Sequence, residues 1–331
     1  MGNIMKKPLH VAEKKKFWFI GSASLILIGL LVIIIFGLNL GIDFTGGATL
    51  KVNTGAYIEA SDANATQVKN IVDASLKAHG LKSETIQKSG SGAVAGYEFK
   101  MQLKLNGKNA SDTDFFAALD EVKAELEADL VAIDGIDKVE ITYDAAGAVA
   151  TKQLVTSTML ALIIALALIL VYIVIRFTFS SAIAAIVGLT HDVLIMLAIC
   201  AIFRVQINTY FIAAVLTIVG YSINNTIIVF DRLRENKALM PDATDTERVN
   251  TSISQMMNRM IHTSLTTLFV MVILVVLGVT SIREFGIPII VGLLAGTYSS
   301  ICIAGPLWTV LNGWGAAIKN KRKYKAKKAE K

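Results

Sequence analysis

Six apolar segments, each long enough to cross a bilayer, constrain the fold of this chain more than any other feature. A helix of about 20 apolar residues spans the hydrocarbon core, and inside lipid its backbone must satisfy its own hydrogen bonds. The chain is 54% hydrophobic and only 18% charged, which is too apolar for one soluble domain. We therefore predict a polytopic α-helical membrane protein with six spans, near Phe17–Leu38, Leu154–Ile175, Ala182–Phe203, Tyr210–Phe230, Arg259–Val279 and Gly286–Leu311.

Charge placement predicts how these spans are oriented. Lys and Arg crowd both ends of the chain, Arg176 follows the second span, and several Arg follow the fourth. Such residues favour the cytoplasmic side. We interpret the terminal basic runs as topological anchors and expect no nucleic-acid partner. The first span lacks a small-residue cleavage site, so we expect an uncleaved anchor. The expected parts are a basic cytoplasmic N-terminus (1–16), a first helix (17–38), an extracytoplasmic domain (39–152), a five-helix region (153–311) and a basic cytoplasmic tail (312–331).

The segment between the first two spans has the pattern of a small α+β domain. Alternating residues predict strands, and apolar residues at helical spacing predict two helices. Ser111 or Asp112 is a candidate cap for the second helix. The predicted order β-α-β-β-α-β is that of a ferredoxin-like unit, with elements at Thr49–Asn53, Asp62–His79, Ser83–Lys88, Tyr97–Leu105, 112–133 and Val139–Tyr143.

The sequence offers little catalytic chemistry. We find no nucleophile–base arrangement, no Gly-rich phosphate loop and no His/Cys cluster with metal-ligand spacing. We therefore expect no enzymatic activity, no cofactor and no metal. Cys200 and Cys302 fall in apolar segments and are interpreted as small core residues.

An acidic residue near the middle of the third span is the first candidate site. Asp192 follows His191, and an ionisable residue inside a membrane helix is a functional hypothesis by default. A hydrogen-bonded Asp that locks helix contacts is an equally good interpretation.

The second candidate is a polar seam between the fourth and fifth spans. Asn224 and Asn225 are adjacent amides in an apolar helix, which favours a bundle interior or a wet path. Arg259 opens the predicted fifth span, with Thr263 on the same face. Asn225 lies about six residues, or ~9 Å, from the end of the fourth span. The two side chains are then at comparable depth, although a snorkelling interface arginine is the alternative for Arg259.

Several motifs together resemble the SecF family, accessory subunits of the bacterial protein-export translocase. By itself, the loop after the first span indicates only a turn beside a membrane, with Asp43 as a cap or solvated. The resemblance extends over the whole chain and rests on Gly41-Ile42-Asp43-Phe44-Thr45-Gly46-Gly47, His191-Asp192-Val193, Val219-Gly220-Tyr221-Ser222-Ile223-Asn224, Phe230-Asp231-Arg232-Leu233-Arg234-Glu235-Asn236 and the run from Asn258 to Thr267.

The resemblance implies a membrane fold of the RND type in a bacterial inner membrane. It also implies a SecD-like partner, the SecYEG channel, an unfolded preprotein substrate and contact with membrane lipids. The implied function is promotion of late translocation by the proton-motive force, or by sodium in some members. Two other functions stay open. One is a structural scaffold for SecD. The other is an RND-like exporter of small molecules or lipids, which would normally need a second outer domain and a doubled six-span unit.

In this family, an Asp in the fourth-span motif acts with the fifth-span Arg in ion coupling. Carried over, the Arg is Arg259 and the Asp position is Asn225, which has no titratable proton. The chain is then a natural variant that couples differently, an engineered neutralisation, or a subunit whose SecD partner carries the acid. We predict that Asn225 accepts a hydrogen bond from Arg259, directly or through water.

Overall fold

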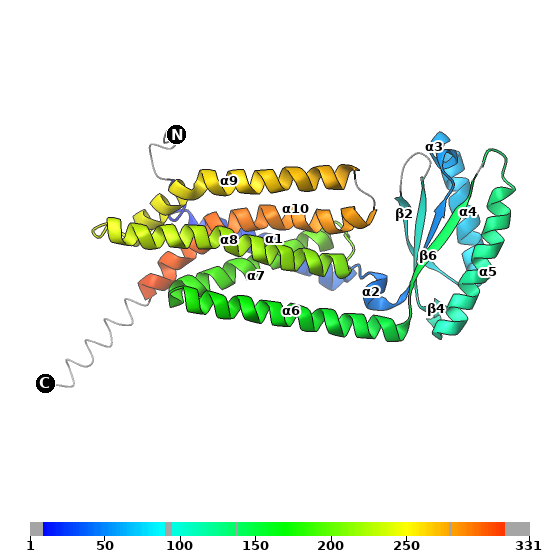
Figure 1. Cartoon of the computed structure of the whole chain (residues 1–331), viewed down its shortest axis with the longest axis horizontal. Coiled ribbons are helices and arrows are strands. Elements are labelled where there is room, and N and C mark those ends of the chain that lie inside the picture. Colours follow the sequence, from blue (N-terminus) through cyan, green and yellow to red (C-terminus); the bar gives the residue numbers. More distant parts are fainter. Residues whose placement is uncertain (1–8, 90–94, 137, 278–279, 315–331) are drawn as a thin grey trace.

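Six long helices form one elongated bundle in the computed structural model, which describes residues 9–89, 95–136, 138–277 and 280–314 (Figure 1). Each is long and apolar enough to cross a membrane, so the predicted six spans are confirmed. Exposed Leu and Ile side chains cover the outer faces of the first two, as expected for surfaces that meet lipid. The helices are α1 (Lys15–Phe36), α6 (Ala148–Arg176), α7 (Phe179–Ile202), α8 (Thr209–Leu239), α9 (Asp245–Leu277) and α10 (Thr280–Ser299), which a π-helical turn (Ser300–Ala304) extends.

α8 and α9 extend furthest beyond their predicted bounds. α8 continues past Phe230 to Leu239, and α9 begins at Asp245 rather than near Arg259. A capping box starts α9, because Thr244 and Glu247 exchange hydrogen bonds of 2.7 and 3.2 Å between side chain and backbone. The predicted boundaries followed the apolar stretch alone, whereas these helices project beyond it as polar, hydrogen-bonded turns.

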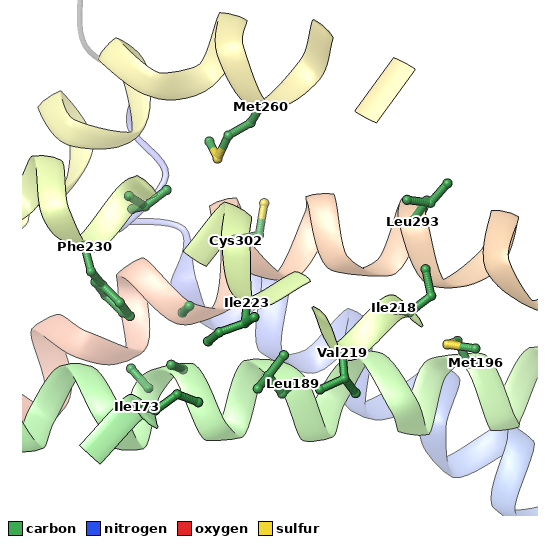
Figure 2. Packing of buried hydrophobic residues seen from close by; sticks show 14 of the residues in the cluster. Ile173, Leu189, Met196, Ile218, Val219, Ile223, Phe230, Met260, Leu293 and Cys302 are labelled. Carbon is green, nitrogen blue, oxygen red and sulfur yellow. The ribbon is translucent and has the colours of Figure 1, made fainter. Parts of the chain in front are cut away.

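The bundle core lies where α7, α8 and α10 meet (Figure 2). Small residues allow these helices to approach closely. A Cβ placed on Gly292 would lie 2.5 Å from Ile218 Cγ1 and 2.7 Å from Met196 Sδ. Gly292 therefore allows α10 to approach α7 and α8 closely.

The outer domain is a four-stranded antiparallel sheet with helices against it (Figure 1). The sheet order β2-β3-β1-β6 places β1 in the centre, paired with both β3 and β6. The predicted order β-α-β-β-α-β is present, and Ser111 caps the second long helix. The elements are β1 (Gly47–Asn53), α4 (Asp62–Ala78), β2 (Ser83–Ser89), β3 (Gly96–Gln102), α5 (Asp112–Val131) and β6 (Glu140–Ala146), with two short helices, α2 (Ile42–Thr45) and α3 (Ala56–Ala60), and a small hairpin of β4 (Lys104–Leu105) and β5 (Lys108–Asn109) in addition.

The loop between α1 and β1 docks the outer domain onto the bundle. Gly41 donates its backbone N–H to the Ile207 carbonyl at 2.8 Å, and Asp43 Oδ2 accepts from the Thr209 N–H at 2.9 Å. Thr209 is the first residue of α8, so Asp43 caps this helix. Gly47 has φ of 132°, and a Cβ there would lie 2.0 Å from the Met101 carbonyl oxygen. These glycines are required because the backbone passes so close to its neighbours.

A polar latch completes the docking. Lys100, on β3, forms an ion pair with Glu284 of α10 at 2.9 Å and also donates to Gln206. Asn208, the N-cap of α8, donates to Glu284 at 2.5 Å. The sheet is thereby bonded to the ends of α8 and α10. Both ends of the described chain lie at the opposite end of the bundle (Figure 1); the basic runs predicted within residues 1–8 and 315–331 lie outside the described residues.

Candidate functional site

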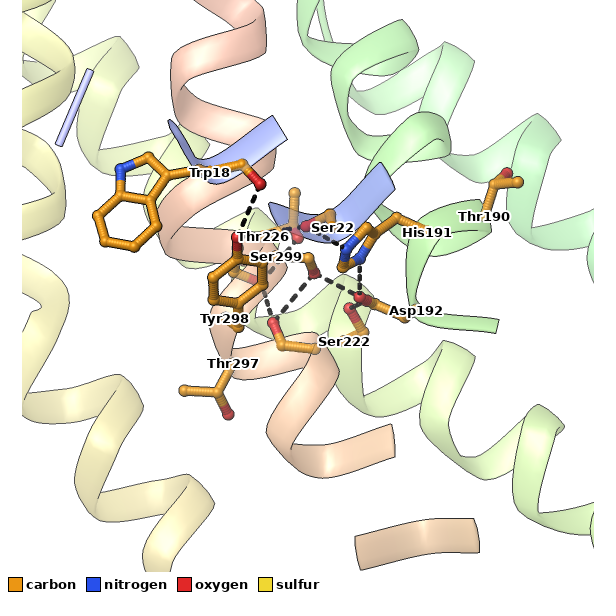
Figure 3. Close-up of polar contacts among 12 residues, drawn as sticks. Trp18, Ser22, Thr190, His191, Asp192, Ser222, Thr226, Thr297, Tyr298 and Ser299 are labelled. Carbon is orange, nitrogen blue, oxygen red and sulfur yellow. Dashed lines mark hydrogen bonds and ion pairs between the residues drawn. The ribbon is translucent and has the colours of Figure 1, made fainter. Parts of the chain in front are cut away.

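Asp192 is the one buried carboxylate of the described membrane helices, with 1% of its surface exposed. Its Oδ2 accepts hydrogen bonds from Ser222 Oγ of α8 at 2.5 Å and from Ser299 Oγ of α10 at 2.8 Å (Figure 3). Its Oδ1 lies 3.0 Å from Nδ1 of His191. Three helices therefore meet at one carboxyl group. The sequence left two interpretations of Asp192 open, an ionisable functional group and a hydrogen-bonded lock between helices, and this arrangement fits both.

Close packing of α8 against α10 positions the two serines. A Cβ on Gly296 would lie 3.0 Å from Ser222 Cβ, so the glycine makes room for α8 at this level. Directly after Ser299 the helix adopts its π-helical turn. Such turns are rare overall, but those that do occur are often found at functional sites.

Further polar pairs line the same helix contacts. Thr226 and Ser300 lie 3.1 Å apart and both are buried. Ser264 of α9 accepts from Thr297 at 2.7 Å and from the Tyr221 hydroxyl at 3.2 Å. These two groups of hydroxyl contacts join α8, α9 and α10 separately from the bonds of Asp192.

Asn225 lies inside the bundle, but Arg259 does not reach it. The Asn225 side chain is 1% exposed, and neither of its polar atoms has a partner among the described residues. Arg259 is exposed, because the face of α9 that packs on the bundle carries Met257, Met260 and Ser264 instead. The direct hydrogen bond predicted between Asn225 and Arg259 is therefore wrong.

The predicted depth match is nevertheless present. Asn225 precedes the end of α8 by 14 residues (239 − 225), and Arg259 follows the start of α9 by 14 residues (259 − 245). The prediction failed because spacing did not give the rotation of α9 about its own axis. That rotation places Arg259 on the outer side of the helix.

Part of the predicted seam faces outward. Asn224 is exposed, and Gly220, one turn earlier on α8, has open space where a Cβ would lie. Asn225 thus lies in the bundle interior, whereas Asn224 lies on the outer surface of this chain. On α9, Arg259 and Thr263 are exposed. We call Gly220, Asn224, Arg259 and Thr263 the outer polar face.

The motif at the end of α8 joins helices together. Asp231 accepts from Arg176 of α6 at 3.0 Å, and Arg232 donates to Gln255 of α9 at 2.6 Å. Asn236 donates to Ser252 of α9 at 2.8 Å. These three motif residues therefore hold the end of α8 to α6 and α9.

Sequence reasoning missed two hydroxyl groups near Asp192, those of Ser22 and Tyr298. Single hydroxyls in apolar helices carry no sequence signal of their own. Only the approach of α1 and α10 to His191 gives them a partner. Among the described residues, no group of three or more His, Cys, Asp or Glu is arranged to hold a metal ion. The candidate site is one carboxyl group held by two hydroxyls and an imidazole.

Comparison with known proteins gives two family matches. Residues 125–314 match the family described as protein export membrane protein SecD/SecF, C-terminal. Residues 31–54, which contain the loop that docks the outer domain, match the SecD/SecF GG motif.

Curated relatives align over most of the chain. The protein translocase subunit SecF of Sebaldella termitidis is 36% identical over 305 residues, which is 90% of each chain. SecF of Borreliella burgdorferi is 34% identical over 92% of this chain and 97% of its own. The translocase subunit SecDF of Bacillus subtilis is 33% identical over 91% of this chain but only 38% of its own.

Solved structures share the fold. The crystal structure of SecDF from Thermus thermophilus, a translocon-associated membrane protein, aligns with a TM-score of 0.74 and 28% identity. It covers 96% of this chain, which spans only 39% of that protein. SecDF in a super-membrane-facing form aligns with a TM-score of 0.61.

Proposed function

This chain belongs to the SecD/SecF family of protein-export membrane proteins, and we propose that it works as the SecF-type subunit of a bacterial Sec translocase. In this proposal it promotes late translocation of preproteins together with a SecD-type subunit, driven by the ion-motive force. It carries no catalytic activity. The observation that supports this most strongly is Asp192, a buried carboxyl group bonded to two other helices.

Protonation of Asp192 is the proposed coupling step. A carboxylate accepts hydrogen bonds only, whereas a protonated carboxyl group must also donate one. Uptake or release of a proton therefore changes the bonds that hold α7 to Ser222 of α8 and Ser299 of α10. Because α8 starts at the Asp43 cap beneath the outer domain, a shift of α8 reaches that domain directly.

Asn225 and Arg259 have a different role in this proposal. Asn225 has no titratable proton, and Arg259 is exposed on the outer side of α9. We propose that the outer polar face packs against a SecD-type subunit of matching six-helix architecture, which supplies an acid to Arg259. Unpaired polar side chains on a membrane helix are costly, which favours a covered face. The longer SecDF relative, of which this chain matches 38%, is consistent with a partner of this kind.

The remaining partners follow from this role. The outer domain contacts the emerging unfolded preprotein or the SecD outer domain, the SecYEG channel lies beside the bundle, and lipids surround it. The protein lies in the inner membrane with both termini in the cytoplasm.

Cysteine labelling tests this orientation. With an impermeant maleimide on intact cells, a cysteine at Lys108 of the outer domain should react, whereas one at Lys237 of α8 should not. The reverse pattern would overturn the proposed topology.

The function itself is tested by following translocation of a preprotein through its last stage. In cells depleted of this chain, we expect slow completion that the wild-type chain restores, but not after a protonophore collapses the ion-motive force. Asp192→Asn should fail to restore it. Thr190→Val is the matched control, because Thr190 lies two residues away on the exposed side of α7.

Two alternatives predict different results. A structural scaffold for SecD would give equal restoration by Asp192→Asn and by the wild type, since only assembly is required. An exporter of small molecules or lipids would leave preprotein completion unchanged on depletion.

A further inference from the structure

His191 connects Asp192 to a row of hydroxyl groups that the proposed coupling step does not use. Its Nδ1 faces Asp192, and its Nε2 lies 3.0 Å from Ser22 Oγ of α1. Ser22 Oγ donates to the Tyr298 hydroxyl at 3.2 Å, and that hydroxyl donates to the Trp18 carbonyl at 3.0 Å (Figure 3). Side chains of α7, α1 and α10 thus form one continuous hydrogen-bonded row.

The end of this row fixes the direction of every bond in it. A carbonyl only accepts, so the Tyr298 hydroxyl uses its single hydrogen on Trp18. Its oxygen therefore accepts from Ser22, and Ser22 in turn accepts from His191. Nε2 of His191 must carry a hydrogen.

The same reasoning counts the protons on the His191–Asp192 pair. With Nε2–H in place, the 3.0 Å contact between Nδ1 and Oδ1 needs one further proton, because two lone pairs would repel. That proton lies on either atom. In both cases the pair is neutral as a whole, which suits its burial. The described residues give this pair no Lys or Arg partner; Ser22, Ser222, Tyr298 and Ser299 are the groups bonded to it or next in the row.

We propose that His191, Ser22 and Tyr298 form a proton relay between Asp192 and the membrane surface at the N-terminal end of α1. The relay rests on the proposed function, for which it supplies the route of the proton. Trp18 follows the first residue of α1 by three positions and Ser22 by seven, or about 4.5 and 10.5 Å of helix rise. The row therefore leads from the bundle interior toward that surface.

Proton release conserves every atom along the row. Nε2–H passes its proton to Ser22, and Ser22 passes its own to Tyr298. The Tyr298 hydroxyl turns its own hydrogen from the Trp18 carbonyl to a water molecule and passes it on. Each hydroxyl loses one hydrogen and gains one. His191 ends neutral with its hydrogen on Nδ1, donating to an Asp192 carboxylate. Uptake reverses these transfers and leaves the hydroxyls as the structure has them, and the imidazole ring need not rotate.

Tyr298→Phe tests the relay because it removes one hydroxyl and keeps the ring. The ring is stacked on His191 with centroids 5.9 Å apart and lies edge-on to Trp18 at 6.1 Å, so packing should survive. Tyr221→Phe is the matched control: its hydroxyl bonds Ser264 and is not part of the row. Ser22→Ala interrupts the row independently, on a different helix.

The assay is proton uptake after a pH jump in proteoliposomes that contain the full chain, its SecD-type partner and the channel. We expect Tyr298→Phe and Ser22→Ala to slow uptake about tenfold or more. We also expect them to change its solvent deuterium isotope effect, which a merely structural role would not do. Tyr221→Phe should match the wild type.

Two outcomes would overturn the relay. If Asp192→Asn stops uptake while Tyr298→Phe and Ser22→Ala both behave like Tyr221→Phe, the relay is wrong and the coupling role of Asp192 stands. If Asp192→Asn changes neither uptake nor preprotein completion, the proposed function fails and the relay with it.

Discussion

Replacing Asp192 by alanine and by asparagine should separate its structural contribution from its protonation. Alanine removes the acceptor for Ser222 and Ser299 and the partner of His191, which are three hydrogen bonds. Hydrogen bonds between membrane helices average about 0.6 and reach about 1.7 kcal/mol. Only the bonds from Ser222 and Ser299 join helices, and together they give about 1 to 3 kcal/mol. Asparagine keeps a carbonyl oxygen that accepts from both serines, so its cost should stay within about 1 kcal/mol.

Reversible unfolding of the full chain in mixed detergent micelles, followed by circular dichroism, measures these differences. Thr190→Ala, on the exposed side of the same helix turn, is the control and should match the wild type. The reasoning is refuted if alanine costs nothing, or if asparagine destabilises as much as alanine. In either case the bonds between Asp192 and its neighbours do not hold the helices together.

Three further predictions concern other parts of the chain. Gly292→Leu should destabilise the bundle by about 1–3 kcal/mol or more through overpacking, measured by thermal unfolding. A double-mutant cycle of Lys100→Met and Glu284→Gln should give a coupling energy of about 1–3 kcal/mol, because both side chains are mostly buried; a coupling near zero would contradict the latch. The hydrogen bond from Lys77 holds the pKa of Asp73 below its usual value, so this pair stabilises the outer domain at pH values above the ordinary pKa of Asp, and the stabilisation is lost as the pH falls through the lowered pKa of Asp73. Asp73→Asn should cost up to about 0.5 kcal/mol at neutral pH and nothing in acid, by urea titration, since the pair is largely exposed.

Much of the architecture could be predicted because periodicity and length carry it. Apolar length predicts the six spans, and alternation along β3 predicts the face that buries Phe99 and Met101. The start of α9 was missed because the prediction followed hydropathy, although the Thr244–Glu247 capping box was present in the sequence. Helix ends beyond the apolar stretch are decided by such local bonds.

The candidate site could be predicted only in part. Asp192 stands out because a carboxylate in an apolar helix needs an explanation, whereas Ser22 and Tyr298 gain meaning only from the packing of α1 and α10 on His191. For Asn225 and Arg259, spacing along each helix predicted depth correctly. The rotation of α9 depends on which residues pack on α8, and spacing alone does not give it.

Infrared difference spectroscopy on the full chain with its SecD-type partner in a bilayer, between acid and neutral pH, tests the central claim most directly. The account predicts carboxyl and carboxylate bands that respond to pH and disappear in Asp192→Asn. These bands should persist in Asp231→Asn, whose carboxylate pairs with Arg176 at the end of the bundle. Identical pH-dependent bands in the wild type and in Asp192→Asn would contradict the claim that Asp192 takes up and releases the coupling proton.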